Sequence, residues 1–174
     1  MKKILILTLV VGLTALFLGG VALAADEAAG PLVKGASLPD NMMVGSMDGG
    51  LVKIKETLGP DYTVFTFMTT ACSACQAEIK SLMILRETTG NKLKVVAISV
   101  DMMGADAVNA YEKRNRYGID YILDTEFNLP PRFGFNFTPS MFLTDAKGTI
   151  LLMKGGFSRS DWKETADAIK ALVK

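Results

Sequence analysis

Two apolar strands flank an amphipathic helix in residues 64–100, and this unit constrains the fold more than any other feature. Residues 64–68 are rich in β-branched and aromatic side chains, which favour a buried strand. Residues 73–88 place apolar side chains on one helical face, and Gly90 follows as a helix stop. Residues 93–100 form a second apolar run with strand composition. The unit predicts an α/β fold.

The rest of the chain predicts how this fold is completed. Further elements are expected as a helix (105–117), a strand (121–123), a helical or irregular segment (126–133), a hairpin (140–144 with 149–153) and a helix (161–173). Asp161 and Glu164 resemble a capping box at the start of the last helix. Residues 37–60 contain short extended segments, which we expect to form an N-terminal β extension of the sheet. Because strand–helix alternation precedes a hairpin, we expect a three-layer sandwich around a mixed sheet.

The first 25 residues have the pattern of an export signal. Two lysines precede an apolar stretch that ends in Ala22-Leu23-Ala24-Ala25, which contains an Ala-x-Ala cleavage pattern. We therefore expect residues 1–25 to be a signal peptide, 26–36 a mobile leader and 37–174 one domain. An uncleaved membrane anchor is the alternative, because the apolar stretch is long enough to span a bilayer. In both cases the domain would be periplasmic or otherwise extracytoplasmic, where disulfides persist.

Charge and histidine content exclude several functions. The chain has 19 basic and 18 acidic residues, so nucleic-acid binding has no electrostatic support. It contains no histidine. This excludes Ser–His–Asp and Cys–His catalysis, and also His-ligated zinc or haem. We expect no metal site and no cofactor.

The two cysteines, Cys72 and Cys75, stand where the first buried strand gives way to the helix. A cysteine at a helix N-terminus has a stabilised thiolate and a lowered pKa, because free N–H groups and the helix dipole favour negative charge. The second cysteine lies within reach for a disulfide. A structural disulfide is one alternative, although so short a loop stabilises a fold little. A zinc clip is another, although it would need four ligands. Thiol–disulfide exchange explains the spacing best.

Three segments resemble the thioredoxin superfamily, and specifically its exported TlpA/ResA-like thiol–disulfide oxidoreductases. These segments are Thr66–Glu78 around the cysteine pair, Val96–Asp101, and Phe137–Ile150 with its Thr-Pro sequence. In element order the resemblance covers residues 36–173. It implies a thioredoxin-like sandwich and an enzyme that exchanges disulfides with other proteins.

The resemblance also implies roles for individual residues. Cys72 would be the attacking nucleophile and Cys75 the resolving thiol. Pro139 matches a proline that is cis in this superfamily and packs beside the disulfide, and the Thr138 backbone would pair with an extended substrate. Glu78 matches an acid that relays protons or tunes thiol pKa values; the alternative is an ordinary carboxylate near a helix N-terminus.

Departures from the family pattern bear on the redox properties. Ala71, which would contact substrate, stands where the family often has tryptophan, and Thr66 is an uncharged residue in the preceding strand. The Ser-Ala pair between the cysteines lacks the His or Pro of strong oxidants, which favours a reductant. The implied partners are protein thiols and disulfides, with apocytochrome c and cytochrome c maturation as one candidate. A membrane or periplasmic donor would reset the cysteine pair.

Two other functions are open. A peroxiredoxin-like peroxidase would use Cys72 with Thr69 and Arg132, although the proline expected at position 65 is Phe65. A Cu(I)-binding module would use the thiols and methionines, which are soft ligands. Met42, Met43 and Met47 are close together in the sequence, but core packing is the simpler explanation for them.

Overall fold

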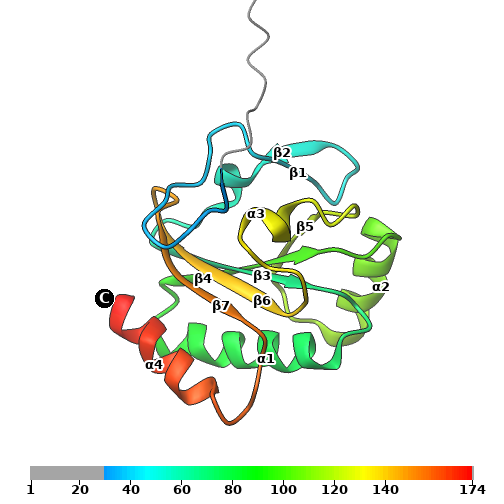
Figure 1. The fold of residues 1–174 in the computed structure, drawn as a ribbon. Helices are drawn as coiled ribbons and strands as arrows, with labels where there is room; N and C mark the ends of the chain where they lie inside the picture. Colours follow the sequence, from blue (N-terminus) through cyan, green and yellow to red (C-terminus); the bar gives the residue numbers. More distant parts are fainter. Residues whose placement is uncertain (1–29, 174) are drawn as a thin grey trace, which may run out of the picture.

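The computed structural model describes residues 30–173, which form a seven-stranded sheet with helices on both faces (Figure 1). The strands are β1 (Met43–Gly45), β2 (Leu51–Lys53), β3 (Tyr62–Met68), β4 (Leu93–Ser99), β5 (Asp120–Leu123), β6 (Ser140–Asp145) and β7 (Ile150–Gly155). The helices are η1 (Ile54–Thr57), α1 (Ser73–Thr88), α2 (Gly104–Asn115), α3 (Leu129–Arg132) and α4 (Trp162–Leu172).

The sheet is mixed, as the sequence predicts. Its strand order is β2-β1-β5-β4-β3-β6-β7, in which β3, β4 and β5 pair in parallel and every other neighbouring pair is antiparallel. β3 is therefore central and buried along almost its whole length, because it pairs with β4 on one side and β6 on the other. The pairing of Phe67 with Ser140 puts the start of β6 next to the end of β3. This register brings the 137–139 loop to the edge of the sheet from which the cysteine motif emerges.

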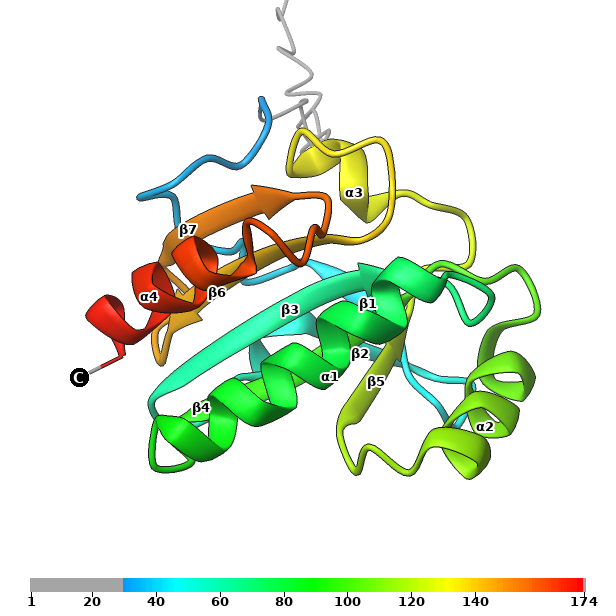
Figure 2. The same ribbon diagram turned by 90° about the horizontal axis from the view of Figure 1, so that it is seen from below.

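Alternate side chains of β3 divide the core between the two faces of the sheet. Phe65 and Phe67 face a cluster with α3 and the N-terminal segment, and Val64 faces α1 and α4. A third cluster, between α1 and α2, includes Cys75 and Tyr111. Figure 2 shows α1, α2 and α4 on one face of the sheet. The result is the predicted three-layer sandwich, with the cysteine helix packed directly on the central strand.

The segment before residue 37 differs in part from the predicted mobile leader. The Leu32 N–H donates to the Arg132 carbonyl (2.6 Å), and Gly35 and Ala36 exchange backbone hydrogen bonds with Ile150. Leu32 and Ala36 also pack against the core. Main-chain pairing therefore fixes the chain to the body from Leu32 onward. The predicted signal peptide, 1–25, lies outside the described residues, and none of the helices within 30–173 is long and apolar enough to span a bilayer.

The predicted capping box at the last helix is wrong. Asp161 is the N-cap of α4, but its backbone is helical and its side chain makes no capping hydrogen bond. The Asp161 carboxylate instead accepts from the Ser160 hydroxyl (2.9 Å). A capping box needs an extended N-cap residue, which places the side chain over the first N–H groups. α4 is held by the burial of Ala166 and Ile169.

Candidate active site

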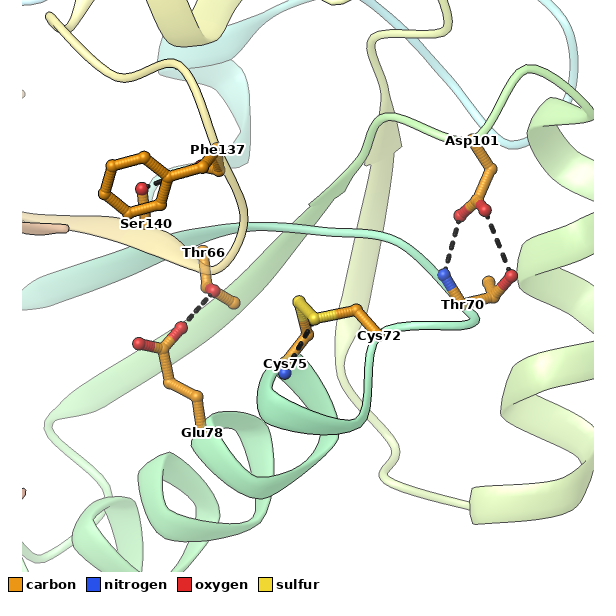
Figure 3. The surroundings of a disulfide bond; sticks show 8 residues. All are labelled: Thr66, Thr70, Cys72, Cys75, Glu78, Asp101, Phe137 and Ser140. Atoms are coloured by element: carbon orange, nitrogen blue, oxygen red, sulfur yellow. Dashed lines mark hydrogen bonds between the residues drawn. A yellow bond between two sulfur atoms is a disulfide. The ribbon is translucent and has the colours of Figure 1, made fainter. Parts of the chain in front are cut away.

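A disulfide joins Cys72 to Cys75 at the N-terminus of α1, with the two Cα atoms 5.2 Å apart (Figure 3). Cys72 is the N-cap residue, and its Sγ accepts from the Cys75 N–H (3.0 Å). Cys72 is partly exposed and Cys75 is fully buried. The first sulfur therefore lies at the helix N-terminus, where its thiolate would be stabilised after reduction, and is open to a partner, whereas the second is shielded.

The cysteine motif is reached through a tight turn held by a neighbouring strand end. The Cys72 N–H donates to the Thr69 carbonyl (3.1 Å), which closes a turn with Thr70 and Ala71 at its centre. The Asp101 carboxylate accepts from the Thr70 N–H (2.9 Å) and from the Thr70 hydroxyl (3.1 Å). Ser99 donates to the same carboxylate (2.7 Å). Asp101 thus ties the loop before Cys72 to the end of β4.

Glu78 lies beneath the disulfide and is 1% exposed. It follows Cys75 by three residues, so both occupy the buried face of α1. The Thr66 hydroxyl, on β3, donates to one carboxylate oxygen at 2.5 Å, and the other oxygen points away from the sulfurs (Figure 3). Burial raises the pKa of Glu78 to about 7, and the Thr66 hydrogen bond opposes this shift. Glu78 is therefore poised to gain or lose a proton near neutrality.

The loop before β6 forms the other side of the site. The Thr138–Pro139 bond is cis, and Pro139 is buried at the start of β6. The Pro139 carbonyl accepts from the Gly156 N–H (2.8 Å). Among residues 30–173, the Thr138 N–H and carbonyl have no hydrogen-bond partner. Phe137, which is 49% exposed, lies against Gly155, where an added Cβ would come within 3.0 Å of its ring.

The predicted site residues gather at one end of the sheet. Cys72 and Cys75 are bonded, and Glu78 lies below them. Pro139 follows from the β3–β6 register, and Ala71 is exposed directly before Cys72. Together with Thr138, which precedes Pro139, these residues belong to segments that meet where β3 ends and β6 begins.

Sequence reasoning missed two features of this region. It did not place Asp101 among the site residues, although the Asp101 carboxylate bridges to Thr70, 31 residues away. It also overlooked the exposed pair Met102 and Met103, which are 91% and 75% exposed directly after Asp101. The acid at the end of a predicted parallel strand was the available signal for Asp101, since such strand ends converge on one edge. No sequence signal marks the methionines as exposed.

The residues of the two alternative functions are brought together only in part: Met47 packs against the same core cluster as Cys72 and Cys75, whereas Met42 belongs to another cluster. Within 30–173, Arg132 contributes its backbone carbonyl to Leu32, and its side chain forms no hydrogen bond or ion pair. Met42 is buried in the core, whereas Met43 is 43% exposed. In the same part of the chain, no three of the Cys, Asp and Glu side chains are grouped to hold a metal ion. The structure adds no support for either alternative.

The fold and the paired cysteines define a thioredoxin-like thiol–disulfide oxidoreductase. The sequence pattern of the AhpC/TSA family matches residues 35–153, and the chain belongs to this family. This range includes the cysteine pair, Glu78 and the Thr138–Pro139 loop. A comparison with curated proteins gives no match.

Solved structures share the fold over most of the chain. A protein assigned as the thiol:disulfide interchange protein DsbE of Chlorobium tepidum has 22% identity and a TM-score of 0.70, covering 82% of this chain and 99% of that one. StoA from Bacillus subtilis has 20% identity and a TM-score of 0.57, covering 80% and 100%. A secreted Mycobacterium tuberculosis disulfide oxidoreductase, described as homologous to E. coli DsbE, has 16% identity and a TM-score of 0.58, covering 74% and 94%.

Proposed function

We propose that the protein is an extracytoplasmic reductant that exchanges its Cys72–Cys75 dithiol with disulfides of partner proteins. One observation carries the proposal: the pair sits at a helix N-terminus with Cys72 accessible and Cys75 buried. This asymmetry suits a two-step exchange, because the exposed thiolate can attack and the shielded thiol can act only within the complex.

The exchange begins with the reduced protein. The Cys72 thiolate attacks one sulfur of a partner disulfide, which forms a mixed disulfide and releases the partner's second sulfur as a thiolate that takes a proton from water. Cys75 then loses its proton and attacks Cys72 Sγ. The mixed disulfide breaks, the Cys72–Cys75 disulfide forms, and the partner's first sulfur leaves and is protonated. Two electrons have passed to the partner, whose disulfide is now a dithiol.

Glu78 is the proposed acceptor of the Cys75 proton. It shares the buried face of α1 with Cys75, and no histidine exists in the chain to take this role. A pKa of about 7 leaves a substantial fraction of Glu78 ionised at neutral pH, so it can accept a proton in the second step. Thr66 holds one carboxylate oxygen and the other points away from the sulfurs in the oxidised protein, so the transfer requires the carboxylate to turn toward Cys75 or a water to relay the proton.

The Thr138 backbone is the proposed docking point for the partner. Its unpaired N–H and carbonyl would bind an extended segment as an added strand beside Cys72, with Ala71 at the opposite edge. The Ser73-Ala74 dipeptide favours a reducing couple. The export signal at 1–25 implies an extracytoplasmic partner, for which apocytochrome c is one candidate, and a separate membrane or periplasmic donor of electrons. The secreted relative from M. tuberculosis supports this location.

The test is to trap the intermediate. Reduced protein carrying Cys75→Ser is mixed with a synthetic peptide that contains one disulfide, and the products are separated without reductant. We expect a 1:1 mixed disulfide through Cys72 that dithiothreitol reverses, because the resolving thiol is missing. Intact mass and peptide mapping identify the linkage.

Cys72→Ser is the matched control, since it also keeps one thiol, but that thiol, Cys75, is buried. It should form little adduct over the same time. An equal yield from the two variants, or an adduct in neither, would contradict the exchange proposal. Rapid consumption of hydrogen peroxide by the wild type, dependent on Cys72, would instead identify the peroxidase alternative.

A further inference from the structure

Asp101 makes three hydrogen bonds that the exchange chemistry does not use. Its two carboxylate oxygens accept from the Thr70 N–H, the Thr70 hydroxyl and the Ser99 hydroxyl at 2.7–3.1 Å. Thr70 lies 31 residues earlier in the chain, so these bonds join two strand ends that are neighbours only in space. Figure 3 shows the two carboxylate oxygens directed at Thr70 from beyond the Cys72 side of the disulfide.

Thr70 is the first of the two central residues in the turn that delivers Cys72 to the helix. The turn is closed by the Cys72 N–H on the Thr69 carbonyl, and α1 starts with the next residue. In the oxidised protein a covalent bond also fixes Cys72. Once the disulfide is reduced, the position of Cys72 depends on this turn and on the first helical hydrogen bonds.

We propose that Asp101 is a positioning residue for the attacking thiol, holding Cys72 at the N-cap of α1 in the dithiol state. The inference rests on the proposed role of Cys72 in exchange. A thiolate gains from the helix N-terminus only within the first turn, so a shift of the loop weakens this stabilisation. Asp101 acts on Cys72 through geometry and not through its own charge.

The pKa of the Cys72 thiol distinguishes an effect of Asp101 on the geometry of the turn from an effect of its negative charge. The fully reduced protein is alkylated with iodoacetamide at a series of pH values, and modification of Cys72 is quantified by peptide mass spectrometry. Asp101→Ala removes all three hydrogen bonds. We expect its Cys72 to titrate at higher pH and to react about three- to tenfold more slowly at neutral pH.

Asp101→Asn keeps an oxygen acceptor for the Thr70 N–H and has nearly the same shape, but it removes the charge. We expect it to restore the alkylation profile of the wild type. Thr70→Val removes only the hydroxyl contact and should give a smaller shift in the same direction as Asp101→Ala. It also provides a second measurement if Asp101→Ala does not fold.

Other outcomes overturn the inference. A lower Cys72 pKa in both Asp101→Asn and Asp101→Ala would show that the negative charge of Asp101 is what matters. An unchanged profile in Asp101→Ala and Thr70→Val would show that the hydrogen bonds between Asp101 and Thr70 have no effect on the Cys72 thiol. Asp106→Ala, which removes an exposed carboxylate from the first turn of α2, is the control and should leave the profile unchanged.

The alkylation measurement does not require exchange with a partner, so failure of this inference and failure of the exchange proposal can be distinguished. If Cys75→Ser traps no peptide but Asp101→Ala still shifts the Cys72 titration, the exchange proposal fails and the positioning role stands. If trapping succeeds and the Asp101 variants leave the Cys72 titration unchanged, the exchange proposal stands and the positioning role of Asp101 fails.

Discussion

Glu78 is a deeply buried carboxylic acid with little hydrogen bonding to stabilise its charged form. It is 1% exposed, and its hydrogen-bond donor within the described residues is the Thr66 hydroxyl. A buried carboxylate with one neutral donor is poorly compensated for the loss of water, so the neutral form is favoured and the pKa rises to about 7. Burial of Glu78 therefore lowers the free energy of unfolding by an amount that depends on pH.

We predict that Glu78 lowers the stability of the oxidised protein as the pH rises. Between about pH 4.5 and about pH 7 the folded state keeps the Glu78 proton and the unfolded chain has lost it. The folded state thus binds more protons, and the free energy of unfolding falls with pH, by up to about 3 kcal/mol. Above about pH 7 the Glu78 contribution is constant. Urea denaturation across this range measures the change.

Glu78→Gln is the matched variant because its amide cannot ionise and still accepts from Thr66. The difference in unfolding free energy between wild type and variant cancels other titrating groups. It should therefore favour the wild type most at acidic pH and decline toward neutrality. A difference that does not vary with pH would mean that Glu78 has an ordinary pKa in the folded protein.

The sequence could place Glu78 near the cysteines but could not show how deeply it is buried. Its spacing from Cys75 put both on adjacent turns of α1, and the family resemblance supplied a role. Its burial depends on β3 and on the loop that follows β7, which lie far away in the sequence. The same reason explains Asp101, whose partner Thr70 is brought close by the parallel pairing of β3 with β4.

At the scale of elements, the N-terminal hairpin joins the sheet through a narrow contact. The β1–β5 register consists of the pair Gly45 and Leu123. A Cβ at Gly45 would lie 3.0 Å from the Leu123 Cβ and 3.1 Å from its backbone oxygen. A side chain here would push the two strands apart, because the nearest atoms belong to or adjoin the backbone.

We therefore expect Gly45→Ala to loosen β1 and β2 from the sheet. The cost in unfolding free energy should be about 1–3 kcal/mol, the usual range for overpacking. Hydrogen exchange of the β1 and β2 amides should accelerate more than that of β3. Gly30→Ala is the control, since a Cβ there meets nothing within 4 Å. Equal exchange rates in Gly45→Ala and the wild type would refute the close contact.

Helices and strands with a clear apolar periodicity could be predicted from the sequence, but the structure at the ends of these elements could not. The expected helix over 73–88 coincides with α1, because its apolar spacing and the following glycine are strong local signals. The Asp161–Glu164 capping box failed because a sequence pattern does not set the backbone of the N-cap residue. The attachment of Leu32 to α3 was also missed, since it depends on a carbonyl that tertiary folding brings close.

At the scale of the whole molecule, the predicted signal peptide, residues 1–25, would direct the protein out of the cytoplasm. We predict that the full chain expressed in a bacterium with a periplasm is cut after Ala24 or Ala25. N-terminal sequencing and intact mass of the periplasmic fraction measure this. Loss of Lys2 and Lys3 changes the net charge from +1 to −1. Recovery of the uncut chain from the membrane fraction would favour the anchor.

The lack of histidine has a practical consequence for the oxidised molecule. Imidazole rings, which dominate the acid–base behaviour of most proteins near neutrality, contribute nothing here. With the sulfurs bonded, burial raises the pKa of Glu78 to about 7, inside that window. With carbon-13 labelling of glutamate, NMR should show the Glu78 carboxyl resonance moving close to pH 7, without overlap from imidazole titration. This signal reports directly on the interior beneath the sulfurs.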